Sequence, residues 1–168
     1  MEAEIPSFRG EYKALRFAFE TYFGKPISLK QRIIMSLMTV DELNDLMRRE
    51  FPQSQTILEA ISSRSSRVRI PVNVSHLRPG GTVSGPTMMS LADTAMYLAL
   101  LAEIGPVLLA VTTNLNIHFV RKPEPERDLI GECSIFKLGK KLAVGEVKIF
   151  SEGIDDVVAH ATCTYSIP

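Results

Sequence analysis

The chain contains 168 residues, of which 19 are basic and 19 acidic, so its formal net charge at pH 7 is zero. Hydrophobic residues make up 45% and charged residues 23%, which is typical of one globular domain with a buried core. We do not expect nucleic acid or an anionic membrane to be the main partner of a chain without net charge.

The cysteines, histidines and first residues exclude further classes. Two cysteines, Cys133 and Cys163, are too few for a disulfide scaffold or a cysteine metal site. The three histidines are scattered, without the spacing of a common metal motif. The first thirteen residues are polar and acidic, unlike a secretory signal. We therefore expect a cytoplasmic protein with no metal site and no cofactor.

The first part of the chain has a helical pattern, from residue 11 to residue 51. Ser28 with Gln31, and Thr39 with Glu42, have the spacing of a capping box, which marks the start of a helix. We predict an N-terminal helical extension over residues 1–53 and a second domain over residues 54–168. Whether the extension is an accessory helix or dispensable is left open.

Strands are predicted wherever apolar and polar residues alternate in the second domain. Such alternation, with one covered face, occupies residues 68–74, 115–119, 130–138, 142–150 and 157–167. The last four of these segments follow one another closely, and we expect them to form a four-strand meander.

The most apolar stretch runs from Pro86 to Val111. Asp93 and Glu103 interrupt it and Gly105 with Pro106 ends it, so we predict a buried helix of about four turns rather than a membrane span. A helix that is apolar on all sides must be enclosed by other elements. The fold class is therefore α+β, with a curved antiparallel sheet wrapped around a central helix.

Asp93 is the unusual residue of this helix, because its neighbours in sequence are apolar. A buried carboxylate is costly unless it is compensated. Hydrogen bonds from Ser90 and Thr94 would give it a purely structural role. Alternatively, Asp93 opens onto a cleft and takes part in chemistry there.

The loop before the helix, residues 78–86, predicts a site for an anion or a developing oxyanion. Ser84 is a candidate N-cap and Pro86 suits the first helical turn. The amides of residues 85–88 would then be unpaired donors at the positive end of the helix dipole. The loop has the spacing of neither a phosphate-binding glycine motif nor a serine-hydrolase elbow.

Residues 81–86 (GTVSGP) and 91–95 (LADTA) resemble the signature of hotdog-fold acyl-CoA thioesterases of the phenylacetic-acid-degradation type. The resemblance continues through residues 111–123 (VTTNLNIHFVRKP) and 138–141 (LGKK), and covers roughly residues 55–167. It implies a hotdog fold, in which an antiparallel sheet wraps a long helix. It also implies a homodimer, further paired as a dimer of dimers, with active sites at the dimer interface.

The resemblance also implies roles for individual residues. Asp93 would activate water or attack the thioester directly. Gly85 would donate its amide to the thioester oxygen, with Ser84 beside it. Thr112 would hold the water. Basic residues would meet the CoA phosphates, and the candidates are Arg121, Lys122, Lys140 and Lys141.

Two departures from the family pattern bear on activity. Ser84 stands where the family usually has a histidine, and Arg78 stands where it usually has an asparagine. Pro86 also removes one amide donor. Arg78 could bind an anionic group, so together with Pro86 it would alter the substrate preference. Of the histidines, only His76 is close enough in sequence to approach this site, whereas His118 and His160 are expected to be half-exposed strand residues.

Two functions follow from these observations. The first is hydrolysis of an acyl-CoA thioester to free acid and CoA, with CoA present only as part of the substrate. The second is a non-catalytic hotdog protein that binds or senses acyl-CoA, which the replaced histidine and asparagine favour.

Overall fold

The computed structural model describes residues 36–168. The predicted Ser28–Gln31 capping box and the first part of the helical extension lie outside these residues. The described residues form one compact unit, Ser36–Pro168. Its helices are α3 (Val40–Glu50) and α4 (Gly85–Ile104), and a short 3-10 turn, η1, covers Val74–His76.

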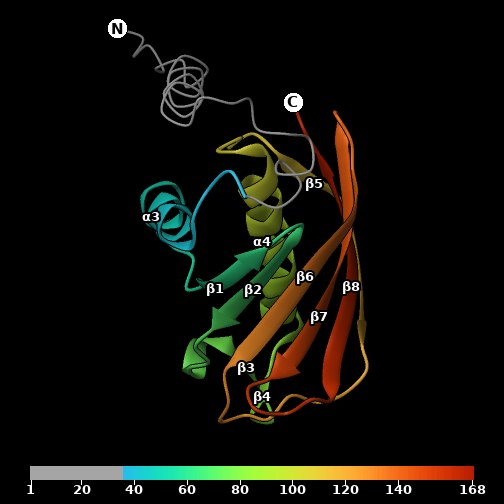
Figure 1. The fold of residues 1–168 in the computed structure, drawn as a ribbon. Helices are drawn as coiled ribbons and strands as arrows, with labels where there is room; N and C mark the ends of the chain where they lie inside the picture. The colour runs from blue at the N-terminus through green and yellow to red at the C-terminus, as the bar shows by residue number, and fades with distance from the viewer. Residues whose placement is uncertain (1–35) are drawn as a thin grey trace, which may run out of the picture. The chain divides into compact units, whose positions relative to one another are not determined.

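A six-stranded antiparallel sheet wraps α4, in the order β1-β2-β6-β7-β8-β5 (Figure 1). The strands are β1 (Ile57–Ser62), β2 (Ser65–Ile70), β5 (Val111–Phe119), β6 (Leu129–Leu138), β7 (Leu142–Ser151) and β8 (Val157–Ser166). The α+β class and the central helix enclosed by a sheet are confirmed, and the arrangement is that of the hotdog fold.

The predicted four-strand meander is wrong in one connection. Strands β6, β7 and β8 do pair in sequence order, but β5 pairs with β8 and not with β6. The place beside β6 is taken by β2. Strand β5 therefore lies at the edge of the sheet. The prediction failed because alternation shows which face of a strand is buried but not which strand lies next to it.

Helix α3 begins at the predicted capping box, since Thr39 and Glu42 each bond the other's backbone amide. It ends at Glu50, shortly before Pro52. Its Asn44 side chain bonds both the amide and the carbonyl of Leu58, each at 3.0 Å, and so covers part of the edge of β1. Helix α3, which belongs to the predicted extension, therefore packs with the sheet in the unit Ser36–Pro168.

Helix α4 contains 20 residues, which is about five and a half turns and thus longer than predicted. By length and composition it could cross a membrane, but 61% of its most apolar stretch is buried inside the protein. The sheet approaches it closely, because Gly131 leaves space for the side chain of Leu91. The apolar character of α4 is thus explained by its place in the core.

The predicted strand over residues 68–74 ends early. Strand β2 stops at Ile70, directly before Pro71, and Val74 is 84% exposed in η1. Two short strands follow, β3 (Leu77–Arg78) and β4 (Thr82–Val83), which pair with each other. Their turn contains Gly80 and Gly81 with φ of 94° and 71°, conformations that favour glycine. This hairpin delivers the chain to the start of α4.

Candidate active site

Asp93 is half-buried on α4 and is held by two hydroxyl groups from the sheet. Thr112 on β5 donates to Asp93 Oδ1 at 2.5 Å, and Tyr165 on β8 donates to the same oxygen at 2.6 Å. The expected structural partners Ser90 and Thr94 make no hydrogen bond with this carboxylate among the described residues. The side chain is thus tied to the sheet, and not to its own helix.

A bulge in β5 turns Thr112 towards the helix. Thr112 pairs with Tyr165 and Asn114 with Thr164, so Thr113 is the extra residue between them. Strict alternation from Leu115 would place Thr112 on the outer face. The bulge shifts it to the face of Leu115, where it reaches Asp93.

Tyr165 is a site residue that the sequence did not reveal, because its alternation identified it only as a core position. It is 3% exposed, and its ring stacks on that of Tyr97 with centroids 6.1 Å apart. Burial raises the pKa of the phenol well above its usual range, and the charge of Asp93 raises it further. The phenol is therefore protonated at neutral pH and acts as a donor. A buried tyrosine hydroxyl requires a hydrogen-bond partner, and this requirement was the one feature of the sequence that pointed to a polar contact at Tyr165.

The start of α4 offers fewer donors than predicted. The Ser84 hydroxyl accepts from the Thr87 amide at 3.3 Å, and the Ser84 carbonyl accepts from the Met88 amide at 3.4 Å. Pro86 has no N–H. Of the amides of residues 85–88, only that of Gly85 is without a partner among the described hydrogen bonds. Ser84 is confirmed as the N-cap, and its hydroxyl also bonds the Thr87 hydroxyl at 2.9 Å.

The loop before α4 is fixed by the backbone of His76. Its carbonyl accepts from the Ser84 amide at 2.9 Å and from the Thr87 hydroxyl at 3.3 Å. Its ring accepts from the Asn73 amide at 3.0 Å. His76 thus shapes the helix N-terminus, while Arg78 is exposed in the neighbouring hairpin.

The four basic candidates lie in two pairs at opposite ends of the sheet. Lys140 and Lys141 form the β6–β7 turn, where the Lys141 carbonyl accepts from the Ile167 amide beside the start of β5. Arg121 and Lys122 follow the other end of β5, and Arg121 is paired with Asp156 at 2.7 Å. Within one chain, the structure does not bring these four side chains together.

The other two histidines lie on the outer face of the sheet. His118 on β5 pairs directly with His160 on β8. His160 Nε2 lies 2.9 Å from a carboxylate oxygen of Glu146. Both histidines are therefore separated from Asp93 by the sheet, because Asp93 bonds the face of the sheet that packs on α4.

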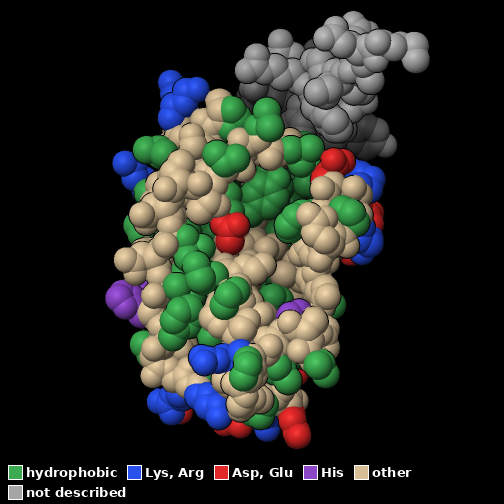
Figure 2. All heavy atoms as spheres, turned by 180° about the vertical axis from the view of Figure 1, so that it is seen from behind, with side chains coloured by type: hydrophobic (Ala, Val, Ile, Leu, Met, Phe, Trp, Pro, Cys, Tyr) green, Lys and Arg blue, Asp and Glu red, His purple; other side chains and the backbone are tan. Residues whose placement is uncertain are grey.

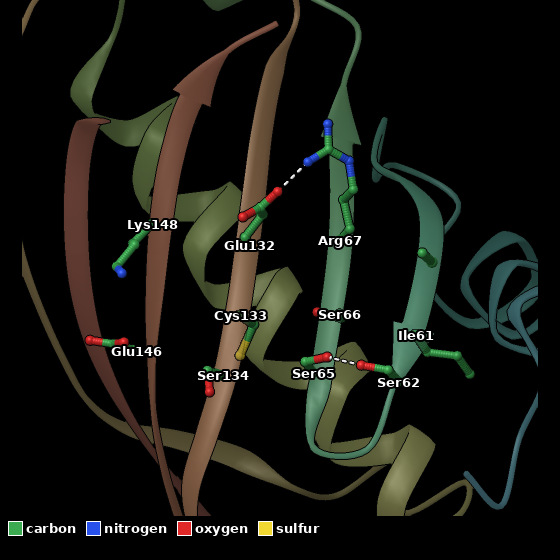
Figure 3. Close-up of a pocket in the computed structure, with 11 residues that line it drawn as sticks. Ile61, Ser62, Ser65, Ser66, Arg67, Glu132, Cys133, Ser134, Glu146 and Lys148 are labelled. Atoms are coloured by element: carbon green, nitrogen blue, oxygen red, sulfur yellow. Dashed lines mark hydrogen bonds and ion pairs between the residues drawn. The ribbon is translucent and has the colours of Figure 1, made fainter. Parts of the chain in front are cut away.

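The two faces of the molecule differ in character. Seen from behind, hydrophobic and uncharged groups surround an isolated acidic group, and the basic side chains visible on this face lie away from it (Figure 2). The outer face of the sheet carries a shallow depression of about 360 Å³ between β1, β2, β6 and β7 (Figure 3). Its charged side chains include the ion pair Arg67–Glu132, and Asp93 is not among its lining residues. Asp93 therefore marks the better candidate site.

Asp93 and the Gly85 amide cannot act on one carbonyl group within a single chain. They are eight residues apart on α4, a rise of about 12 Å along the axis. The amides of a first helical turn point out of the N-terminal end, which is away from Asp93. An oxygen bound by the Gly85 amide would therefore lie beyond the helix end, far from the carboxylate.

Comparisons with known proteins agree with this architecture. Residues 80–158 match the family model of the thioesterase superfamily. A candidate thioesterase from Silicibacter sp. TM1040 shares 45% identity over 79% of this chain and 94% of its own, with a TM-score of 0.74. No curated protein matches the sequence.

Two more distant structures share the fold. A thioesterase from Haemophilus influenzae has 18% identity over 81% of this chain and 94% of its own, with a TM-score of 0.71. A mutant of the phenylacetic acid degradation protein PaaI from Thermus thermophilus has 23% identity over 71% of this chain and 99% of its own, with a TM-score of 0.62. With its fold, its family match and its 45% identical relative, the chain belongs to the thioesterase superfamily.

Proposed function

We propose that the protein is a cytoplasmic homodimer that hydrolyses an acyl-CoA thioester to the free acid and CoA. The observation that carries this proposal is the state of the Asp93 carboxylate. Two hydroxyls hold its Oδ1, while Oδ2 has no hydrogen-bond partner among the described residues. A carboxylate fixed in this way among apolar groups is suited to act on a substrate.

In the proposed reaction, Asp93 Oδ2 takes a proton from a water molecule as the water oxygen bonds to the thioester carbonyl carbon. The carbonyl oxygen becomes an oxyanion, which accepts a hydrogen bond from a Gly85 amide. The C–S bond then breaks, and the thiolate of CoA takes up the proton. Direct attack by Oδ2, followed by hydrolysis of the resulting anhydride, is the alternative route.

The Gly85 amide in this scheme belongs to Gly85 of the partner subunit. Among residues 36–168, strand β5 has a strand neighbour on one side only. Exposed apolar residues accompany this edge, among them Val111, Phe119 and Val120. An unpaired edge with apolar flanks favours pairing with a second strand. Antiparallel pairing of two β5 strands would bring each helix N-terminus towards the other chain's Asp93. We extend the proposal to a dimer of dimers on the family resemblance alone.

Assembly across two chains would also bring basic residues towards one site. Lys140 and Lys141 lie at the Asp93 end of β5, and Arg121 and Lys122 lie at the Gly85 end. We propose these side chains as contacts for CoA phosphates. Arg78, which makes no ion pair within the described residues, would bind an anionic group of the substrate.

The test is turnover of a panel of acyl-CoA thioesters by the wild type and by Asp93→Asn. Removing the base should lower kcat by about 10²- to 10⁴-fold, whereas Asp155→Asn on the exposed β7–β8 turn should leave it unchanged. Unchanged hydrolysis in Asp93→Asn overturns the role of Asp93. Label in the Asp93 carboxylate after a single turnover in H₂¹⁸O would establish direct attack with hydrolysis at the aspartyl carbonyl, because the general-base route places ¹⁸O only in the product acid.

Non-catalytic binding of acyl-CoA is the second candidate, and one observation favours it. The Ser84 oxygen accepts from the Thr87 amide, and its proton is engaged by the Thr87 hydroxyl, which itself donates to the His76 carbonyl. Pro86 lacks an amide, so a single donor is left for the oxyanion. Tight binding of acyl-CoA without release of CoA over many hours would favour this function over hydrolysis.

A further inference from the structure

We propose that Tyr165 is a positioning residue that determines which oxygen of Asp93 reacts. Its phenol and the Thr112 hydroxyl occupy Oδ1 together, which leaves Oδ2 for the substrate or water. This inference rests on the proposed function, since it assigns the reacting atom of that site.

The contact is built into the core of the fold. Tyr165 and Thr112 are directly paired across β8 and β5, so their side chains leave the sheet on the same face. The Tyr165 ring is buried and packed on Tyr97, which lies one helical turn after Asp93. The phenol therefore reaches Asp93 from a side chain with little freedom to move.

The oxygen of the phenol is also within 3.1 Å of the Asp93 backbone carbonyl. A tyrosine hydroxyl has one proton to donate. The carboxylate oxygen, at 2.6 Å and negatively charged, is the stronger acceptor of the two. Tyr165 therefore contacts the backbone of α4 as well as the carboxylate that it orients.

An aspartate carboxyl group rotates easily about χ2, because that torsion has broad minima. With a single donor on Oδ1, the two oxygens could exchange places. Two donors from rigid strands oppose that rotation. Loss of the phenol should therefore lower the fraction of carboxylates in the reactive orientation.

The test is Tyr165→Phe, which keeps the ring and removes the hydroxyl. The variant loses a hydrogen bond to a charged group, and the free energy of such a bond corresponds to a fall in kcat of about 10- to 100-fold. The KM for the thioester should stay within about twofold. The matched control is Tyr97→Phe, which loses a hydroxyl from the same aromatic pair but no bond to Asp93, and should retain the wild-type kcat and KM.

A second variant separates positioning from packing. Incorporation of 3-fluorotyrosine at position 165 keeps the donor and should retain kcat within about threefold, because the bond to Oδ1 persists. Thermal unfolding of each variant shows whether the fold is intact. Wild-type kcat in Tyr165→Phe would overturn the inference while Asp93→Asn still tests the proposed function. If Asp93→Asn hydrolyses normally, the proposed function fails first and the role of Tyr165 fails with it.

Discussion

Gly145 on β7 lies so close to Met96 on α4 that a Cβ atom on the glycine would be 2.8 Å from the methionine sulfur. The same Cβ would lie 2.8 Å from the carbonyl oxygen of Ser134 on the neighbouring strand. One of these contacts is with backbone, which cannot turn aside as a flexible side chain can. The absence of a side chain at this position therefore sets the distance between sheet and helix.

We expect Gly145→Ala to lower the free energy of unfolding by about 1–3 kcal/mol, as overpacking of a well-filled core does. Urea denaturation measures this change. The control is Lys148→Ala on the same strand, an exposed position that should change stability by less than about 0.5 kcal/mol. If Gly145→Ala is as stable as the wild type, sheet and helix can separate without cost, contrary to the close contact seen here.

Thr112 and Thr113 provide a matched pair for testing the bulge. Thr112 donates to Asp93 Oδ1, whereas Thr113 donates to the Thr164 carbonyl at 3.2 Å. We expect Thr112→Ala to lower kcat about 10-fold or more, because a hydrogen bond to a charged group is lost. Thr113→Ala should retain most of the activity. Equal losses in steady-state assays of both variants would contradict the assignment of Thr112 to the site.

The main elements of the fold could be predicted from the sequence because burial dictates their patterns. An apolar helix interrupted by a single acidic residue in its first half, and strands alternating every second residue, fit only a helix enclosed by a sheet. The pairing of β5 with β8 could not be predicted in this way. Periodicity describes the two faces of a strand, whereas the choice of neighbour depends on contacts distant in sequence.

The candidate site was predictable in part, for physical reasons that differ among its residues. Asp93 was identifiable because a carboxylate in apolar sequence needs an explanation. The orientation of Thr112 depends on the bulge at Thr113, which reverses the alternation and has no clear mark in the sequence. Tyr165 was recognised only as a buried residue, since alternation does not show where its hydroxyl finds a partner.

On the outer face of the sheet, Arg69 forms ion pairs with three carboxylates. This cluster predicts that the stability of the fold depends on pH in the acidic range. Its guanidinium pairs with Glu59 at 2.5 Å, Asp128 at 2.8 Å and Glu152 at 2.7 Å. The bond from Arg69 holds the pKa of Glu152 below its usual range. Because the folded-state pKa is the lower one, the stabilisation is complete above the unfolded-state value of about 4.3 and is lost as pH falls below it.

Glu152→Gln should therefore show a smaller fall in Tm between pH 6 and pH 3 than the wild type, with the difference arising below about pH 4.3. Thermal unfolding followed by circular dichroism across this range measures it. Glu126→Gln, at an exposed position in the loop before β6, is the control and should follow the wild-type curve. A wild-type response in Glu152→Gln would show that Arg69 stabilises the fold without this partner.

If each active site is built from two chains, two inactive variants with different defects should restore activity when they form a heterodimer. A site within one chain would not show this effect. Asp93→Asn lacks the base but keeps its Gly85 amide. Gly85→Val keeps Asp93, but its side chain meets the Phe119 ring, which lies 3.3 Å from the Cβ position, and crowds the amide. Each variant alone should be inactive. When they are mixed and allowed to exchange subunits, half of the dimers should be heterodimers with one intact site each, which restores about a quarter of the wild-type activity.

The exchange is checked by differential tagging of the two variants and by light scattering, which gives the mass of the dimer. The control mixture is Asp93→Asn with an Asp93→Asn, Gly85→Val double variant, in which no heterodimer contains an Asp93, so no activity should return. Inactivity of the first mixture despite proven heterodimers would place Asp93 and its oxyanion donor in the same chain. That outcome would require an oxyanion donor other than Gly85, because the Gly85 amide points away from Asp93 at the far end of eight helical residues.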